Sequence, residues 1–259
     1  MVLGGILADS IGWRMAFVWL GLGWGSLALL LCFFWLYDGY DASRKARAAN
    51  PDASASKSLL GDAPGLSVEE AWRSVALRRI AISTFVIMVV TIALVVHQIP
   101  ILQSIGIDRG TAATYAGIAG LFGVAGKLVT GWLLDRYAAR WVGGLTLAAT
   151  SLTFILLLLP DRSWSIILAA MLINGYAAGT KLQIAGYLTS AYGGMKNFGL
   201  IFGTMASLIA AGSGLGPLMA GFLFDTYGNY DVYLWIGIIG TLISSVLIFG
   251  LGPYPAWHR

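Results

Sequence analysis

The chain has 259 residues, of which 58% are hydrophobic and 11% charged, and its mean hydropathy is +0.79. Soluble domains carry about a quarter charged residues, so this composition excludes a soluble globular protein. The net charge of +4 comes mainly from loop cations, as the positive-inside rule of membrane proteins predicts, and we expect no nucleic-acid partner. The composition therefore predicts an all-α integral membrane protein.

Apolar runs of about 20 residues, the length that crosses ~30 Å of hydrocarbon, recur along the chain. They predict about seven transmembrane helices, at residues 14–37, 80–103, 112–134, 141–159, 164–190, 199–223 and 232–252. The apolar residues 1–8 are too few to cross a membrane and do not resemble a signal peptide. We interpret them as the end of a helix that begins upstream.

Between the first two predicted spans the composition changes. Residues 38–78 are rich in Ala, Ser, Asp, Lys and Arg and contain Pro51 and Pro64, which is typical of a solvated linker. A short amphipathic piece is expected within it, near residues 68–75.

The distribution of lysine and arginine predicts the orientation in the membrane. The side that carries the linker also receives Arg136, Arg140, Lys196 and Arg259, whereas the other side receives Arg14, Arg109 and Arg162. Because cytoplasmic loops are enriched in cations, the linker and the C-terminus are predicted to be cytoplasmic, in a multi-pass protein of the cell membrane.

An internal repeat relates the two ends of the chain. At a constant offset of 216, five residues recur as Gly221, Asp225, Gly228, Trp235 and Gly237, and their first copies are Gly5, Asp9, Gly12, Trp19 and Gly21. So long an offset suggests two multi-helix halves related by an axis along the membrane normal. The later copy follows four spans of its own half, so we expect a missing N-terminal half upstream. The expected segments are 1–37 as a remnant of that half, 38–78 as linker, and 79–259 as a six-helix bundle with a short tail.

The segment 126–136, GKLVTGWLLDR, resembles the signature of the major facilitator superfamily, which lies between the second and third helices of each half. The whole chain resembles a transporter of that family from the end of its fifth helix through its twelfth. Residues 97–100 (HQIP), 187–190 (YLTS) and 197–199 (NFG) are similar to the monocarboxylate and oxalate–formate antiporter branch.

The same segment contains a candidate gate. Gly131 allows two helices to approach closely, and Asp135 can cap a helix end or pair with a cation. The resemblance implies a latch for the inward-closed state, made by Gly131, Asp135 and Arg136 with Lys127 and Arg140 beside them. The alternative is that the two arginines only follow the positive-inside rule.

Four residues are candidates for substrate binding. Lys181 is a charge deep inside a span, which costs on the order of 3 kcal/mol unless it faces water or a partner. It shares a helical face with Asn174, so both could line a central pathway; the alternative is that Lys181 extends to the headgroups. His97 and Gln98, just before Pro100, could bind an anion or carry a proton, or form a structural hydrogen bond between helices.

Two stripes of small residues on the same predicted helix, which spans about residues 199–223, favour close helix packing: Gly212 with Gly216, and Gly199, Gly203, Ser207 with Ala211. The sequence contains neither a phosphate-binding loop nor a metal-ligand cluster, so no cofactor and no metal are expected.

The residues together favour a secondary active transporter that moves a small organic anion, of the carboxylate class, by alternating access, with protons or a counter-substrate as coupling partner. One alternative is an incomplete transporter without activity of its own. The other is a membrane-embedded enzyme, which the sequence does not support because no nucleophile, base or metal constellation is present.

Overall fold

The computed structural model describes residues 12–35, 64–160 and 163–255, and in these ranges it is helical without a β-sheet. Seven of the helices found there are long and apolar enough to cross a membrane, which confirms the predicted spans. They are α2 (Trp13–Trp35), α5 (Val75–Ser104), α6 (Arg109–Leu134), α7 (Ala139–Leu158), α8 (Trp164–Gly193), α9 (Phe198–Tyr227) and α10 (Asp231–Phe249). A short helix, α4 (Val68–Arg73), precedes α5 at the predicted amphipathic piece.

The helix ends differ from the predicted ones by a few residues, and at α5 and α6 a polar cap, which hydropathy does not register, extends the helix. The hydroxyl oxygen of Ser74 accepts a hydrogen bond from the amide of Leu77, so α5 begins before its first apolar residues. In the same way the carboxylate of Asp108 accepts from the amide of Thr111 and begins α6.

The chain divides into two compact units, residues 1–61 and residues 62–259. In the first unit α2 is apolar around its whole circumference, and Ala16 is its one buried residue. Such a helix is typical of a membrane span. Residues 1–11, 36–63, Arg162 and Arg259 lie outside the described residues, so what was predicted for them stays a prediction.

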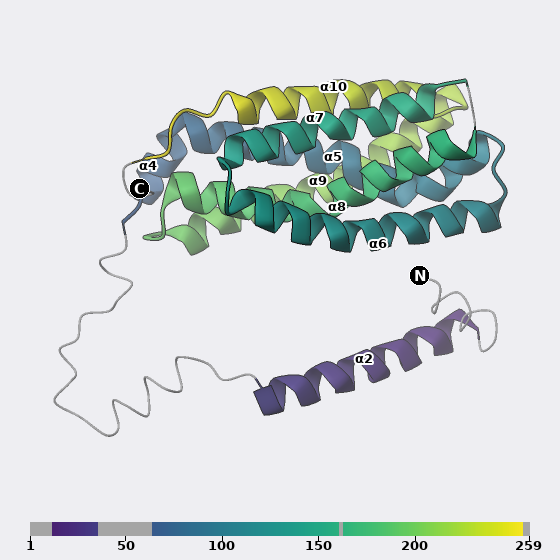
Figure 1. Cartoon of the computed structure of the whole chain (residues 1–259), viewed down its shortest axis with the longest axis horizontal. Helices are drawn as coiled ribbons and strands as arrows, with labels where there is room; N and C mark the ends of the chain where they lie inside the picture. The colour runs from purple at the N-terminus through teal and green to yellow at the C-terminus, as the bar shows by residue number, and fades with distance from the viewer. Residues whose placement is uncertain (1–11, 36–63, 161–162, 256–259) are drawn as a thin grey trace. The chain divides into compact units, whose positions relative to one another are not determined.

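The second unit is a bundle of six long helices built from two three-helix halves. Helix α5 packs against α8, α9 and α10, while α8 packs against α5, α6 and α7, and α7 packs against α10. Exchanging α5, α6 and α7 for α8, α9 and α10 leaves this set of contacts unchanged. Since the chain reverses direction three times between α5 and α8, through α6 and α7, these two helices run in opposite directions (Figure 1). This is the inverted three-plus-three repeat found in many transporters.

Glycines set the closest approaches between helices in this bundle. A Cβ on Gly175 or Gly179 of α8 would collide with the backbone carbonyl of Ala119 or Gly123 of α6. On α9 a Cβ on Gly216 would collide with the carbonyl oxygen of Val89 in α5. Small residues four apart therefore let backbones touch at both crossings, as in other membrane helix pairs.

Close helix packing was predicted for both small-residue stripes of α9, and only one of them shows it. Gly212 and Gly216 pack directly on α5, which confirms close packing. At Gly199 and Gly203, by contrast, an added Cβ would have nothing within 4 Å, and this stripe is exposed in the described part of the chain.

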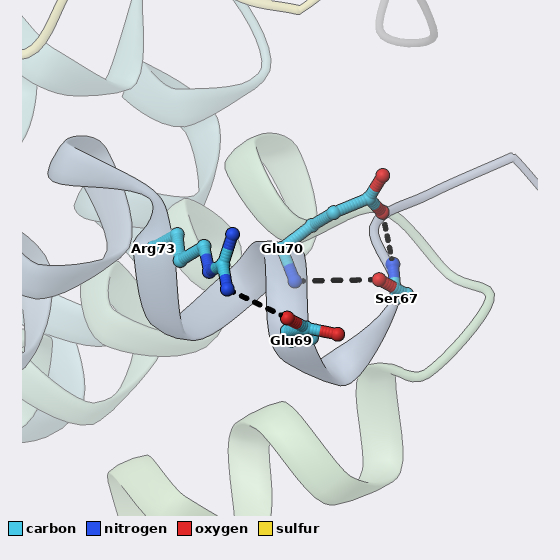
Figure 2. Close-up of polar contacts among 4 residues, drawn as sticks. All are labelled: Ser67, Glu69, Glu70 and Arg73. Carbon is cyan, nitrogen blue, oxygen red and sulfur yellow. Dashed lines mark hydrogen bonds and ion pairs between the residues drawn. The ribbon is translucent and has the colours of Figure 1, made fainter.

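Helix α4 is held in shape by its own polar ends (Figure 2). The amide of Glu70 donates to Ser67 Oγ at 3.3 Å, and the Ser67 amide donates back to the Glu70 carboxylate at 2.7 Å, which is a capping box. An ion pair between Arg73 and Glu69, 2.8 Å long, spans one further turn. The hydrogen bonds from the backbone and hydroxyl of Ser67 hold the pKa of the Glu70 carboxyl below its ordinary value.

Candidate functional site: a polar seam in the helix bundle

Lys181 lies inside the bundle, and its residue surface is only 5% exposed. Its ammonium Nζ donates a hydrogen bond to Thr91 Oγ1 of α5 at 2.5 Å, and that hydroxyl in turn donates to the carbonyl of Ile87 at 2.5 Å. The side chain therefore crosses to the middle of α5 instead of extending to the headgroups. A cavity of about 20 Å³, lined also by Ser83 and Thr84, adjoins it and has room for about one water molecule.

A second polar pair joins the same two helices. Asn174 Nδ2 donates to Gln98 Oε1 at 3.2 Å, and both residues are buried, at 2% and 6% exposure. The side-chain amide nitrogen of Gln98, Nε2, is also buried, and it has no hydrogen-bond partner among the described residues. An unsatisfied buried donor is costly, so it marks a place where a further acceptor would be stabilising.

The two pairs form a polar seam, by which we mean Thr91, Gln98, Asn174 and Lys181. On each helix the two members are seven residues apart, which is two turns or about 10 Å. Because α5 and α8 run antiparallel, the later residue of one helix meets the earlier residue of the other. The two predicted residues of α8, Lys181 and Asn174, thus share the face toward α5.

His97 points away from this seam although it neighbours Gln98 in the sequence. Successive residues of a helix are about 100° apart, so His97 faces α9. Its Nδ1 lies 3.0 Å from the hydroxyl of Tyr230, and its Nε2 lies 3.2 Å from the carbonyl oxygen of Pro217. A carbonyl can only accept, so these partners place the proton on Nε2 and let Nδ1 accept from Tyr230. This is the geometry of a structural bond between helices, and a proton-carrying role stays a prediction.

The predicted gate residues lie at the end of the bundle where α6 stops. Lys127, Asp135 and Arg136 are exposed, and the Arg136 guanidinium stacks over the ring of Trp132 at 4.0 Å. The one ion pair recorded among the described residues is that between Arg73 and Glu69, so Asp135 pairs with no cation there.

The other two gate residues contact the second three-helix half. A Cβ on Gly131 would approach Gln183 Nε2 of α8 to 3.0 Å, so the glycine does permit a close approach. Arg140 Nη1 donates to the carbonyl of Leu251, just after α10, at 3.3 Å. The structure thus positions Gly131 and Arg140 by contacts within the bundle and leaves Lys127, Asp135 and Arg136 on its surface.

Sequence reasoning missed two polar partners. Thr91 was not singled out because threonine is common in apolar helices, yet its spacing of seven from Gln98 was a usable signal. Tyr230 lies in the loop before α10, so no pattern within one helix connects it with His97. No group of three potential metal ligands occurs among residues 12–35, 64–160 and 163–255.

A bundle of two inverted three-helix halves with polar side chains joined at its centre is the architecture of many membrane transport proteins. The chain matches the Major Facilitator Superfamily over residues 1–137 and, in a second overlapping match, over residues 80–258. It therefore belongs to the major facilitator superfamily, a family of transporters that is in general non-enzymatic, and its described helices are those of a multi-pass membrane protein.

Two named relatives illustrate the similarity. Monocarboxylate transporter 12 of Rattus norvegicus is 25% identical over 177 residues, which is 64% of this chain and 36% of that protein. The multi-drug resistance efflux pump PmrA of Streptococcus pneumoniae is 29% identical over 157 residues, covering 57% of this chain and 38% of the pump. The matched part of this chain thus spans little more than a third of the length of these relatives.

Proposed function

We propose that the chain is the C-terminal larger part of a transporter that carries a small organic anion, a carboxylate, by alternating access. The observation that carries this proposal is the buried Lys181, which makes no ion pair among the described residues. An ammonium removed from water and left without a countercharge is costly, by several kcal/mol. A carboxylate substrate would supply the missing charge.

The hydrogen-bonding capacity of the seam supports the same substrate class. A lysine ammonium has three donors, and one of them is directed to Thr91. The free Nε2 of Gln98 adds a neutral donor two helical turns away. Charge-assisted hydrogen bonds to a carboxylate are roughly twice as strong as neutral ones. The name of the relatives called monocarboxylate transporter 12 agrees with this class.

Transport requires the seam to open. The cavity beside Lys181, of about 20 Å³, is too small for a carboxylate larger than a water molecule, so we interpret this conformation as occluded at the seam. Only two hydrogen bonds hold α5 to α8 at these positions, each worth about 0.5–3 kcal/mol. Rocking of this six-helix bundle against the missing N-terminal half, together with a local separation of α5 from α8, would therefore expose Lys181 at modest cost.

The gate completes the cycle in this proposal. Asp135, exposed and without a cation partner in the described residues, would pair with a cation of the missing N-terminal half when the cytoplasmic side closes. The linker and the C-terminus would then be cytoplasmic. A reporter inserted at residue 53 should remain in the cytoplasm, and export of that reporter would reverse the orientation.

A specific observation favours each of two alternatives. The match to PmrA suggests drug efflux as an alternative function. Many drugs are cationic, however, and the buried cation would repel them. The match covers 36% of the rat relative, which suggests the other alternative, a fragment without activity of its own.

Uptake of labelled lactate and of ethidium into proteoliposomes would distinguish these alternatives, using the 259-residue chain alone and the chain joined to the coding sequence found upstream. We expect lactate uptake by the extended protein. Ethidium transport without lactate transport would refute the anion assignment, and lactate uptake by the chain alone would refute the need for the missing half.

A further inference from the structure

An apolar groove lies where α4, α5 and α9 meet, at the end of the bundle where α5 and α9 both begin. Its cavity is about 60 Å³, and we call it the α4 groove. The residues that define it are Trp72, Leu77, Arg78, Leu200, Thr204 and Leu208. Arg78 is its one charged member, and the rest of the lining is almost wholly apolar.

The floor and the mouth of the α4 groove differ in chemistry. From Leu200 to Leu208 the wall formed by α9 descends about 12 Å into the bundle, without a charged side chain. At the other end lie the exposed Arg78 and Trp72, the latter 62% exposed. Tryptophan and arginine are the residues that gather at the headgroup level of a membrane. The groove therefore has one cationic end and a hydrocarbon-like interior.

The surface onto which the groove opens distinguishes a lipid from a protein occupant. Helix α9 carries a stripe of large exposed side chains, including Leu200, Leu215, Leu218 and Phe222, with exposures of 57%, 51%, 71% and 69%. The groove opens beside Leu200 on this stripe. Of the small-residue stripe, where another helix could approach closely, Gly203 lies about 60° around α9 from Leu200, while Ser207 and Ala211 lie within about 20° of it. At the level of the groove large apolar side chains predominate, which is typical of a lipid-facing surface.

Hydrogen bonds hold α4 in place at the cationic end of the groove. The capping box of α4 fixes its first turn (Figure 2), and the amide of Leu66, just before it, donates to the carbonyl of Gly193 at 2.9 Å. The side chain of Asn197 also donates to the carbonyl of Leu66 at 2.9 Å. Arg78 Nη2 in turn reaches the carbonyl of Arg73 at 3.5 Å, a long bond that leaves the other guanidinium donors available for an anion. Arg73 itself is paired with Glu69.

We propose that the α4 groove binds one anionic phospholipid, with an acyl chain along α9 and the phosphate on Arg78. The apolar wall matches the acyl chain, and the guanidinium can bind a phosphate through two parallel hydrogen bonds. A zwitterionic lipid presents the same acyl chains but a neutral headgroup. Preference for the anionic lipid therefore reports on Arg78, whereas retention of any lipid reports on the groove.

Native mass spectrometry of the 259-residue chain, released from vesicles of equal phosphatidylglycerol and phosphatidylcholine, tests the proposal. We expect the unchanged chain to retain one phosphatidylglycerol in preference to phosphatidylcholine. Arg78→Gln should reduce that preference about fivefold, the effect of one cation near an anionic headgroup. Thr204→Trp, which fills the groove, should reduce retention of both lipids.

The matched control is Arg136→Gln, which removes an exposed cation at the same end of the bundle but outside the groove. Its lipid preference should equal that of the unchanged chain. An equal loss in Arg78→Gln and Arg136→Gln would show a general charge effect and overturn the site. Equal retention of the two lipids by the unchanged chain would overturn the anionic preference. Full retention by a monodisperse Thr204→Trp chain would place the lipid elsewhere and overturn the groove.

Discussion

Replacing Lys181 by glutamine removes the buried charge while keeping a hydrogen-bond donor on a side chain that is one bond shorter. In the structure the residue is 5% exposed, and the hydrogen bond from its ammonium to Thr91 Oγ1 is 2.5 Å long. A lysine at the centre of a span costs about 2.5–3.5 kcal/mol, so Lys181→Gln should leave membrane insertion unchanged or improve it. If the charge attracts the substrate, the concentration for half-maximal uptake should rise about tenfold or more, which corresponds to at least ~1.4 kcal/mol.

The assay is concentration-dependent uptake of labelled lactate by the full-length protein, with expression matched between variants. Thr91→Val is the informative companion, because it keeps the charge and removes its hydrogen bond. It should lower thermal stability by about 1.5–3 kcal/mol, the value of a bond to a charged group, with a smaller effect on half-saturation. An unchanged half-saturation in Lys181→Gln, together with normal turnover, would refute the anion-binding role of this lysine.

Three further predictions concern packing, gating and pH. Gly179→Ala should destabilise the bundle by about 1–3 kcal/mol in thermal unfolding, because the added Cβ would meet the Gly123 carbonyl. The control Gly199→Ala, whose added Cβ has nothing within 4 Å, should be neutral or slightly stabilising. Equal effects of the two substitutions would contradict the close crossing. Asp135→Asn should insert normally but exchange substrate more slowly, and wild-type exchange would favour the alternative that the motif only follows the distribution of loop charge. Because the pKa of Glu70 is lowered in the folded state, its ionised carboxylate stabilises α4. This stabilisation is fully present at pH values above the ordinary pKa of 4.5 and is lost as the pH falls through the lowered, folded-state pKa. Hydrogen exchange of α4, corrected for intrinsic rates, should therefore accelerate in that acidic window in the unchanged chain but not in Glu70→Gln, and identical profiles would contradict the capping role.

The sequence by itself determined the seven spans, because a run of about 20 apolar residues has few stable environments other than a bilayer. The sequence also identified Lys181 as a candidate, because a charged residue within a span is costly and can be recognised whichever way its side chain points. Close packing at Gly212 and Gly216 could be predicted for a similar reason: small residues four apart lie on one helical face. These are properties of one segment at a time.

Only the tertiary structure decided which neighbours those residues meet. Periodicity placed Lys181 and Asn174 on one face of α8, but the identity of Thr91 and Gln98 as their partners depends on the antiparallel register of α5. His97 and Gln98 are adjacent in sequence, yet the 100° rotation between them directs His97 to α9 and Gln98 to α8. Hydropathy weighs composition along the chain, whereas contacts depend on how helices rotate and cross, and that information lies in the packing of all six helices together.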